Sequence, residues 1–424
     1  MAKLVYEDDR IIFTKEMKKE YTILIPSMAP YHFDFFIDIL ESEGYKAEIL
    51  QNNSFDLINE GMKYSHNDIC VPAMLVIGQF IDAIKTGGYD LTKIAVIISQ
   101  TGGGCRASNY INLIRKAFKK AHYEYIPIIS FNSVGLEENP GFKITPRMTL
   151  KLTNALLFGD VLMQIVNETL PYEINSGETL EVYAKAHKLL AKSLRYNDIR
   201  AWLFPKKLVE QAIKLFTLIP VDKSVRKPKV GVVGEIYVKY SPLGNNDLEN
   251  VLRHEGFEVI TPSIFDFFLY TFDSTVHDIK KYGGSKISMF SNFVTIEFVE
   301  KRKKIVAEAL DKYGFIKPIP YRELKKLAEG FIGYGTHVGE GWLLTAEMVH
   351  LIHSDVPNIV CTQPFGCMPN HIAGKGMLKR IKDNLPESNI ITIDYDTSAT
   401  EINQLNRIRL MIANAKKNMK KTEK

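Results

Sequence analysis

The chain has 424 residues, of which 46% are hydrophobic and 24% charged, with a formal net charge of +5. This usage is ordinary for globular proteins, gives no reason to expect long disorder, and at this length indicates two or three domains. No basic stripe interleaved with aromatic residues occurs, so nucleic-acid binding is not expected. The basic C-terminal segment "AKKNMKKTEK" is expected to be a frayed, solvated tail.

The first residues, "MAKLVYEDDR", lack the basic start and the apolar run of a signal peptide. No uninterrupted apolar segment approaches the ~18 residues that are needed to span a bilayer. We therefore expect a cytoplasmic protein without a membrane partner. Cytoplasmic thiols stay reduced, so the four cysteines indicate a metal site or catalysis rather than disulfides.

The first third of the chain alternates short apolar runs, expected to be buried strands, with amphipathic stretches expected to be helices. Gly44 follows the first of these helices, as glycines at helix C-termini do. Strands that alternate with helices predict a mostly parallel, doubly wound sheet. The expected strands lie at 21–25, 46–50, 93–99 and 124–132, and the expected helices at 33–42 and 106–123.

The pattern changes at Pro146. Apolar residues then repeat at three- and four-residue spacing to about Leu218, which predicts a helical segment. The polar stretch "VDKSVRKPKV" is expected to be a linker. A second α/β unit opens at Lys229, and its "EGFEV" matches "EGYKAEI" of the first unit, so two related halves are expected. A helical insertion is expected at 263–322, strands at 358–361 and 389–396, and a helix at 375–385.

The predicted fold class is α/β, with two Rossmann-like parallel-sheet lobes, helical insertions and a site between the lobes. The expected domains are a first α/β lobe at 1–145, a helical segment at 146–227, and a second α/β lobe with a helical insertion at 228–424.

All four cysteines stand beside glycines or prolines, in three segments that are remote in sequence. Cys70 precedes Pro72, which favours the first turn of a helix, and Cys105 follows a strand and precedes a helix. Helix N-termini favour the thiolate form of cysteine. Cys361 is expected to close a strand, with Cys367 in the loop after it. Ligands gather beyond the carboxyl ends of strands, so two facing lobes would bring these thiols together.

Iron–sulfur clusters are held by cysteine thiolates and tuned by hydrogen bonds to the sulfurs. Glycines would let the backbone approach such a cluster, and prolines would stiffen the loop. Two alternatives stay open at this point. Free cysteines are often buried and inert, above all Cys361 as the last core residue of a strand. Structural zinc usually takes C-x(2–4)-C pairs, which the chain lacks. The glycines that would approach the cluster are Gly102, Gly103, Gly104 and Gly366, and the prolines that would stiffen the loop are Pro364 and Pro369.

Four segments carry a family resemblance: "NDICVPAMLVIGQFIDA", "TGGGCRASNYINLIRKAF", "VGEIYVKYSPLGNNDLENVLRHEGFEV" and "EGWLLTAEMVHLI…NIVCTQPFGCMPNHIAGKGMLKRIK". They resemble the iron–sulfur proteins related to 2-hydroxyacyl-CoA dehydratases. More closely, the chain is similar to the C-terminal region of the large fused CoA-substrate-specific enzyme activase proteins. The resemblance covers nearly the whole chain, and "QPFGCMPNH" is its most specific motif.

The resemblance implies a [4Fe-4S] cluster between the lobes, held by Cys70, Cys105 and Cys367. Cys361 is then either a fourth ligand, which would close the cluster, or a spectator, which would leave one iron open. Electrons would come from a separate ATP-hydrolysing iron–sulfur activator protein. They would serve a difficult reduction or a radical dehydration, with a CoA thioester or another small molecule as substrate. The resemblance also implies a dimer, whereas a double cluster is not expected because it needs more cysteines.

Whether the chain is an enzyme stays open at this stage. It could be a dehydratase-like lyase or an ATP-dependent reductase component. It could also be a non-catalytic electron carrier or scaffold subunit, with Cys361 as the fourth ligand. The third alternative is a metal-free α/β binding module.

No G-x-x-x-x-G-K-[ST] loop is present, so ATP hydrolysis is assigned to the partner. The Gly-rich stretch at 333–342 would bind phosphate or form a tight structural loop. His337, Glu340 and His371 are candidate proton donors near the cluster, although surface or capping roles are common for histidine. Asn245 and Asn246 would bind a ligand or cap the next helix. Arg106 would pair with the charge of the cluster or substrate, or form a surface ion pair.

Overall fold

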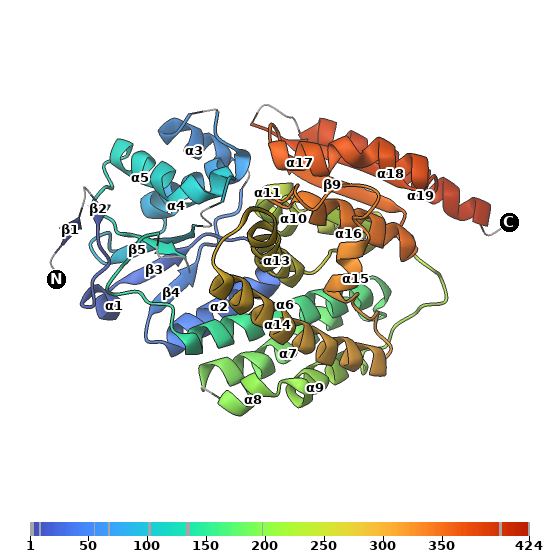
Figure 1. Cartoon of the computed structure of the whole chain (residues 1–424), viewed down its shortest axis with the longest axis horizontal. Coiled ribbons are helices and arrows are strands. Elements are labelled where there is room, and N and C mark those ends of the chain that lie inside the picture. The colour runs from blue at the N-terminus through green and yellow to red at the C-terminus, as the bar shows by residue number, and fades with distance from the viewer. Residues whose placement is uncertain are drawn as a thin grey trace.

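A computed structural model of the chain describes residues 4–7, 10–54, 56–66, 68–100, 103–132, 136–196, 198–397 and 401–422. It contains two four-stranded parallel sheets in separate lobes, with long helices packed below and between them (Figure 1). The predicted fold class, α/β with two Rossmann-like lobes, is confirmed.

The first sheet has the strand order β4-β3-β5-β6. Alternate residues of a strand point to opposite faces, and here both faces are buried. Ile23 and Ile97 face the core that contains α2, whereas Leu24 and Val96 face the core that contains α4 and α5. The elements of this lobe are β1 (Tyr6–Glu7), β2 (Arg10–Ile11), α1 (Met17–Glu20), β3 (Thr22–Ile25), α2 (Pro30–Ser42), β4 (Lys46–Ile49), α3 (Leu57–Tyr64), α4 (Val71–Thr86), β5 (Ile94–Ser99), η1 (Arg106–Asn109), α5 (Tyr110–Lys120) and β6 (Ile128–Phe131).

The second sheet has the order β8-β7-β9-β10. In both sheets the first strand lies between the second and the third, and the fourth lies outside the third. The expected relation between the two halves is therefore present in the strand order. The elements are β7 (Lys229–Gly234), α10 (Ile236–Tyr240), α11 (Pro242–Asn245), α12 (Leu248–His254), β8 (Glu258–Ile260), α16 (Gly341–His353), β9 (Asn358–Pro364), α17 (Met368–Ala373), η3 (Lys375–Met377), α18 (Leu378–Asn384), β10 (Asn389–Tyr395) and α19 (Glu401–Thr422).

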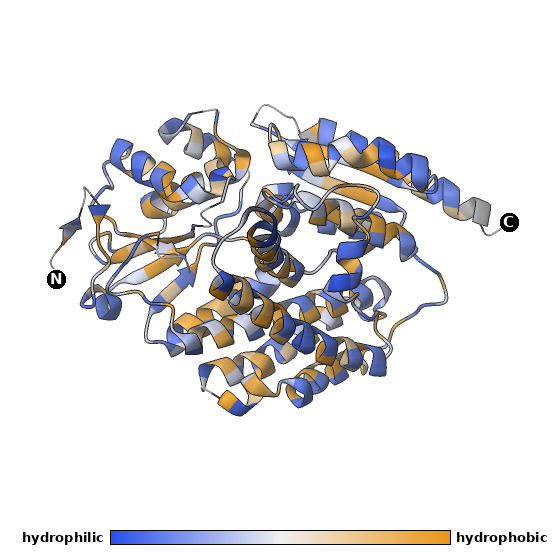
Figure 2. Cartoon of the chain, in the orientation of Figure 1, coloured by the Kyte–Doolittle hydropathy of each residue, from blue (hydrophilic) through white to orange (hydrophobic). Residues whose placement is uncertain are grey.

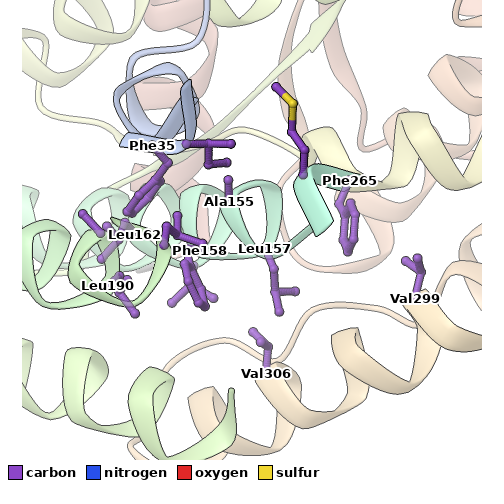
Figure 3. Close-up of a cluster of buried hydrophobic side chains, with 14 of the residues drawn as sticks. Phe35, Ala155, Leu157, Phe158, Leu162, Leu190, Phe265, Val299 and Val306 are labelled. Atoms are coloured by element: carbon purple, nitrogen blue, oxygen red, sulfur yellow. The ribbon is translucent and has the colours of Figure 1, made fainter. Parts of the chain in front are cut away.

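The remaining helices form one layer that both lobes share. Figure 3 shows its core, in which Leu157, Phe158 and Leu162 of α6 lie among side chains of α2, α7, α13 and α14. The helical segment and the insertion of the second lobe thus pack together although they are far apart in sequence. These elements are α6 (Pro146–Thr169), η2 (Leu170–Tyr172), α7 (Glu178–Arg195), α8 (Ile199–Leu203), α9 (Lys206–Phe216), α13 (Ile264–Tyr282), α14 (Lys286–Lys312) and α15 (Tyr321–Lys326).

The helical run from Pro146 to Tyr172 is long and apolar enough to cross a membrane by length and composition. However, 61% of its most apolar window is buried inside the protein, as in the core helix of a soluble protein. Figure 2 shows both apolar and hydrophilic residues on the helices of this layer, and large apolar side chains stay exposed on α14, among them Ile287, Phe290 and Phe293.

The basic C-terminal segment was expected to be frayed and solvated; where the structure describes it, α19 continues to Thr422, while residues 416–418 are exposed as expected. Ile408, Met411, Ile412 and Ala415 are spaced so that they share one helix face, and they are buried against the second sheet. This packing stabilises the helix through its amphipathic face. Lys416 on the other side stays exposed, as expected for a solvated segment.

Candidate functional site

The site lies where the two lobes meet. Tyr237 and Leu243 of the second lobe are buried in the core cluster of α4 and α5 in the first lobe. Figure 1 shows α4 on one side of this junction and α10 and α11 on the other. Val338 of the Gly-rich loop approaches Gly104, where a Cβ would lie 3.5 Å from the valine side chain. The loop that carries Cys105 is therefore in contact with the second lobe.

Three of the four cysteines occupy the same structural position, the N-cap of a helix. Cys70 is the N-cap of α4 and Cys105 that of η1, so the expected helix N-termini are confirmed. Cys367 is the N-cap of α17, a short helix that the sequence analysis placed in a loop. Pro follows at the first or second position of both α4 and α17, where its fixed φ suits a helix start.

Each of these three sulfurs has a hydrogen-bond partner. The Sγ of Cys70 and the hydroxyl of Tyr110 are 3.0 Å apart. The Sγ of Cys105 accepts the backbone N–H of Ala107 at 3.5 Å. The Sγ of Cys367 accepts the side-chain Nδ2–H of Asn370 at 3.3 Å. The three thiols are thus held in place by groups of their own lobe.

Glu235 is the residue that connects the three thiols electrostatically. It follows β7, and its carboxylate accepts the backbone N–H of Val238 at 2.8 Å, which caps α10. Burial raises the pKa of Cys105 to about 11, and the charge of Glu235 adds to this effect. Burial raises the pKa of Cys367 to about 12, and the charges of Glu340 and then Glu235 add to it. The pKa of Cys70 is also raised, by burial first and by Glu235 in addition. All three thiols are therefore protonated near neutral pH unless a cation compensates their charge.

Glu340, one of the candidate proton donors, lies inside the site and is 7% exposed. One of its oxygens accepts the backbone N–H of Ile236 at 2.9 Å, and the other accepts Nδ2–H of Asn370 at 2.6 Å. Burial raises the pKa of Glu340, and burial together with the charge of Glu340 raises the pKa of Glu235 to about 8. Two carboxyl groups thus share one dry region beside the thiols.

The Gly-rich stretch forms a tight loop that aims Glu340 into the site. The backbone N–H of Trp342 donates to the carbonyl of Thr336 at 2.7 Å and closes the loop. Gly341 has φ +45°, and a Cβ there would lie 2.3 Å from the carbonyl oxygen of Thr336. This geometry supports the structural alternative for the loop.

The two candidate histidines make other contacts. His337 Nε2 is 2.9 Å from a carboxylate oxygen of Asp278 on α13, and its Nδ1 is 3.3 Å from the carbonyl oxygen of Gly335. His371 Nδ1 is 2.9 Å from the carbonyl oxygen of Cys367, and its Nε2 is 3.8 Å from Asp394. His371 therefore supports the main chain of the cysteine loop, and His337 joins that lobe's Gly-rich loop to α13.

The capping alternative holds for Asn245, whose Oδ1 accepts the backbone N–H of Leu248 at 3.0 Å at the start of α12. It was wrong for Asn246, whose Nδ2–H donates to Gln404 on α19 at 3.0 Å. The guanidinium of Arg106 donates to the backbone carbonyl of Asp68, so it joins the loops of the first two cysteines.

Cys361 was expected to close its strand, and this was wrong. It lies in the middle of β9, which continues to Pro364, because the backbone of this stretch pairs with both β7 and β10. Its side chain is fully buried in the apolar cluster with Leu344 and Met348 of α16. A Cβ on Gly374 would lie 3.1 Å from its Sγ, so the thiol is closely packed.

Within the ranges that the structure describes, no three His, Cys, Asp or Glu side chains lie close enough together to hold a single metal ion. Gly102, expected to let the backbone approach a cluster, lies outside those ranges.

Sequence reasoning missed three residues of the site. Glu235 stands at the carboxyl end of a strand, so the rule that ligands gather there could have found it. Asn370 is three residues after Cys367, which is the spacing of a reciprocal helix cap. Tyr110 gave no local signal, since its role depends on the distance to Cys70.

Comparison of the sequence with protein-family models finds no match, and no curated protein is significantly similar to the chain.

Proposed function

We propose that the chain is an iron–sulfur protein in which Cys70, Cys105 and Cys367 hold one [4Fe-4S] cluster at the junction of the lobes. The observation that carries the proposal is the common position of these three thiols. Each stands at the N-cap position of a helix, and the Gly-rich loop contacts both the loop of Cys105 and α17, which Cys367 precedes. Helix N-termini and nearby N–H donors stabilise negatively charged sulfur.

The three cysteine sulfurs are of the chemical type that binds such a cluster. Cysteine thiolates are the usual ligands of iron–sulfur clusters. Because the pKa values of the thiols are raised, the positive charge of bound iron is needed to stabilise their thiolate form. The bound cluster would supply one-electron chemistry at low potential. The carboxyl groups of Glu235, which is half-buried, and of Glu340, which is buried, would hold protons beside it.

The position of Cys361 favours a cluster with three protein ligands. To reach the others, its thiol would have to leave the core between β9 and α16. A closed, four-cysteine electron carrier is therefore the weaker alternative. With one iron open, the chain would act on a substrate, in a difficult reduction or a radical dehydration of a CoA thioester or another small molecule. The electron would come from an ATP-hydrolysing activator protein, since no nucleotide-binding loop occurs in the sequence.

The test is the iron and acid-labile sulfide content of protein that has been purified and reconstituted without oxygen. We expect about four of each per chain and a paramagnetic reduced state in EPR. Each of the substitutions Cys70→Ser, Cys105→Ser and Cys367→Ser should lower the iron content strongly. The matched control is Cys361→Ala, which removes a thiol from the core without placing a hydroxyl there.

Cys361→Ala should bind as much iron as the wild type, although it will be less stable because it leaves a small cavity. Loss of iron in this variant, in protein that remains folded by circular dichroism, would support the closed carrier instead. A wild-type protein without iron under these conditions would overturn the proposal.

A further inference from the structure

Asn370 makes contacts that extend beyond the capping of its helix. The residue is fully buried, and its Nδ2 donates both to Glu340 at 2.6 Å and to the Sγ of Cys367 at 3.3 Å. A Cys367 sulfur that ligates the cluster is a thiolate and only accepts, so the nitrogen end of the amide must face it when the cluster is bound. The orientation of the side chain is thereby fixed.

The other end of the same amide is left without a partner. Asn370 Oδ1 is buried and accepts no hydrogen bond in the part of the chain that the structure describes. A buried polar atom without a partner costs stability, and an apolar side chain would avoid this cost. The position therefore retains a group whose benefit lies in what its nitrogen does.

Glu340 fixes the position of that nitrogen. Its second oxygen accepts the backbone N–H of Ile236, directly after Glu235. The carboxylate thus joins the Gly-rich loop, the start of α10 and α17. The Nδ2 of Asn370 also donates to a carboxylate that is itself hydrogen-bonded to the main chain. It therefore keeps its distance to the Sγ of Cys367 better than a freely rotating side chain would.

We propose that Asn370 is a positioning residue that holds Cys367 toward the cluster and sets the potential of the cluster through its N–H···S hydrogen bond. The inference rests on the proposed function. Hydrogen bonds to ligand sulfurs stabilise the added electron, because the donor carries partial positive charge. Removal of this donor should make the cluster harder to reduce.

The test uses the full chain with its reconstituted cluster and compares Asn370→Ala with Thr345→Val. Thr345 is also fully buried, and its hydroxyl donates to the carbonyl of Ala373 at 2.6 Å, at the opposite end of α17. Both changes remove a buried hydrogen bond to the same short helix, but only the first removes a donor to sulfur. Asn370→Ser also removes the donor to the sulfur, because a serine side chain is too short to reach it, but it keeps a polar side chain at this position.

The readouts are iron per chain and the midpoint potential from an EPR-monitored redox titration. We expect Asn370→Ala and Asn370→Ser to have more negative midpoints than the wild type, and Thr345→Val to keep the wild-type midpoint. Iron loss in both Asn370 variants with full iron in Thr345→Val would also support the positioning role.

A wild-type midpoint in Asn370 variants that carry full iron would overturn the inference and leave the proposed function standing. So would equal iron loss in the Asn370 and Thr345 variants, because the loss would then reflect the packing of α17. Absence of iron from the wild-type protein would instead overturn the proposed function, and this inference with it.

Discussion

At the residue scale, the carboxyl group of Glu235 lies where ionisation is unfavourable. It is half-buried beside Glu340, and the loss of solvent, first, and the charge of Glu340 raise its pKa from 4.5 to about 8. Between these two pH values the folded protein binds a proton that the unfolded chain has released. Stability from this group is therefore fully present below pH 4.5 and is lost as the pH rises through 8.

We expect Glu235→Gln to be more stable than the wild type at pH 8 to 9, by on the order of 1–3 kcal/mol, and close to it near pH 5. The amide oxygen can still cap α10, whereas the penalty of ionisation is gone. The measurement is urea unfolding of the cluster-free protein as a function of pH. Glu308→Gln, at an exposed position of α14, is the control and should follow the wild-type curve. Parallel curves for Glu235→Gln and the wild type would contradict the prediction.

At the scale of elements, the Gly-rich loop and the short helix α17 place the site on rigid supports. Pro369 packs against Gly339, where a Cβ would lie 3.0 Å from the proline ring. Gly339 and Gly341 both have positive φ, which only glycine adopts without strain. The loop can therefore approach α17 closely enough for Glu340 to reach Asn370.

Gly341→Ala should destabilise the protein by roughly 2 kcal/mol or more and lower its iron content. The new Cβ would meet the carbonyl of Thr336 at 2.3 Å and the hydroxyl of Tyr270 at 2.4 Å, so the loop would have to move and carry Glu340 with it. The matched control is Gly333→Ala in the same loop, where nothing lies within 4 Å of a Cβ. Thermal unfolding and iron content are the measurements, and equal effects of the two changes would refute the prediction.

Some of these elements could be predicted from the sequence and others could not. Apolar runs located the strands because both faces of a parallel sheet are buried. α17 has only one and a half turns and escaped detection, since its six residues show no full period. The end of β9 was misplaced because pairing with two neighbours, rather than local propensity, extends it past Cys361.

At the scale of the whole molecule, the carboxylate of Asp160 on α6 is hydrogen-bonded to α2 and to the start of α13. His32 of α2 is 3.0 Å from one of its oxygens, and Ser263 donates to the other at 2.5 Å. The same carboxylate accepts the backbone N–H of Ile264 at the start of α13. Burial alone would raise the pKa of Asp160, but the hydrogen bonds from His32 and Ser263 hold it below its usual value.

Asp160→Ala should therefore cost on the order of 3 kcal/mol in the free energy of unfolding, because it removes a buried charge from several partners at once. Asp198→Ala is the control, since Asp198 only caps the exposed helix α8 through Ala201. Asp198→Ala should lower the free energy of unfolding by about 1 kcal/mol. Urea unfolding at neutral pH distinguishes the two, and a cost at Asp160 no larger than that at Asp198 would contradict the role assigned to it.

The contact between lobes was the least predictable part of the site. The sequence could show that three thiols stand beside glycines and prolines. It predicted that two facing lobes would bring the thiols together, but not which contacts join the lobes, because these depend on packing between segments far apart in sequence. The position of Glu235 at the end of a strand could have marked it as a candidate, but its effect on the thiols arises across the junction and not from its neighbours in the chain.

The order of strands in the second sheet has a consequence for the synthesis of the protein. β9 lies between β7 and β10, and Cys367 follows it directly, far along the chain from Cys70 and Cys105. Chains emerge from the ribosome with the N-terminus first, so a newly made first lobe presents Cys70 and Cys105 long before the third thiol exists. On the proposed function, iron can therefore be loaded only after β9 and the loop that carries Cys367 have been made, and a chain arrested before β9 would present an unfinished site.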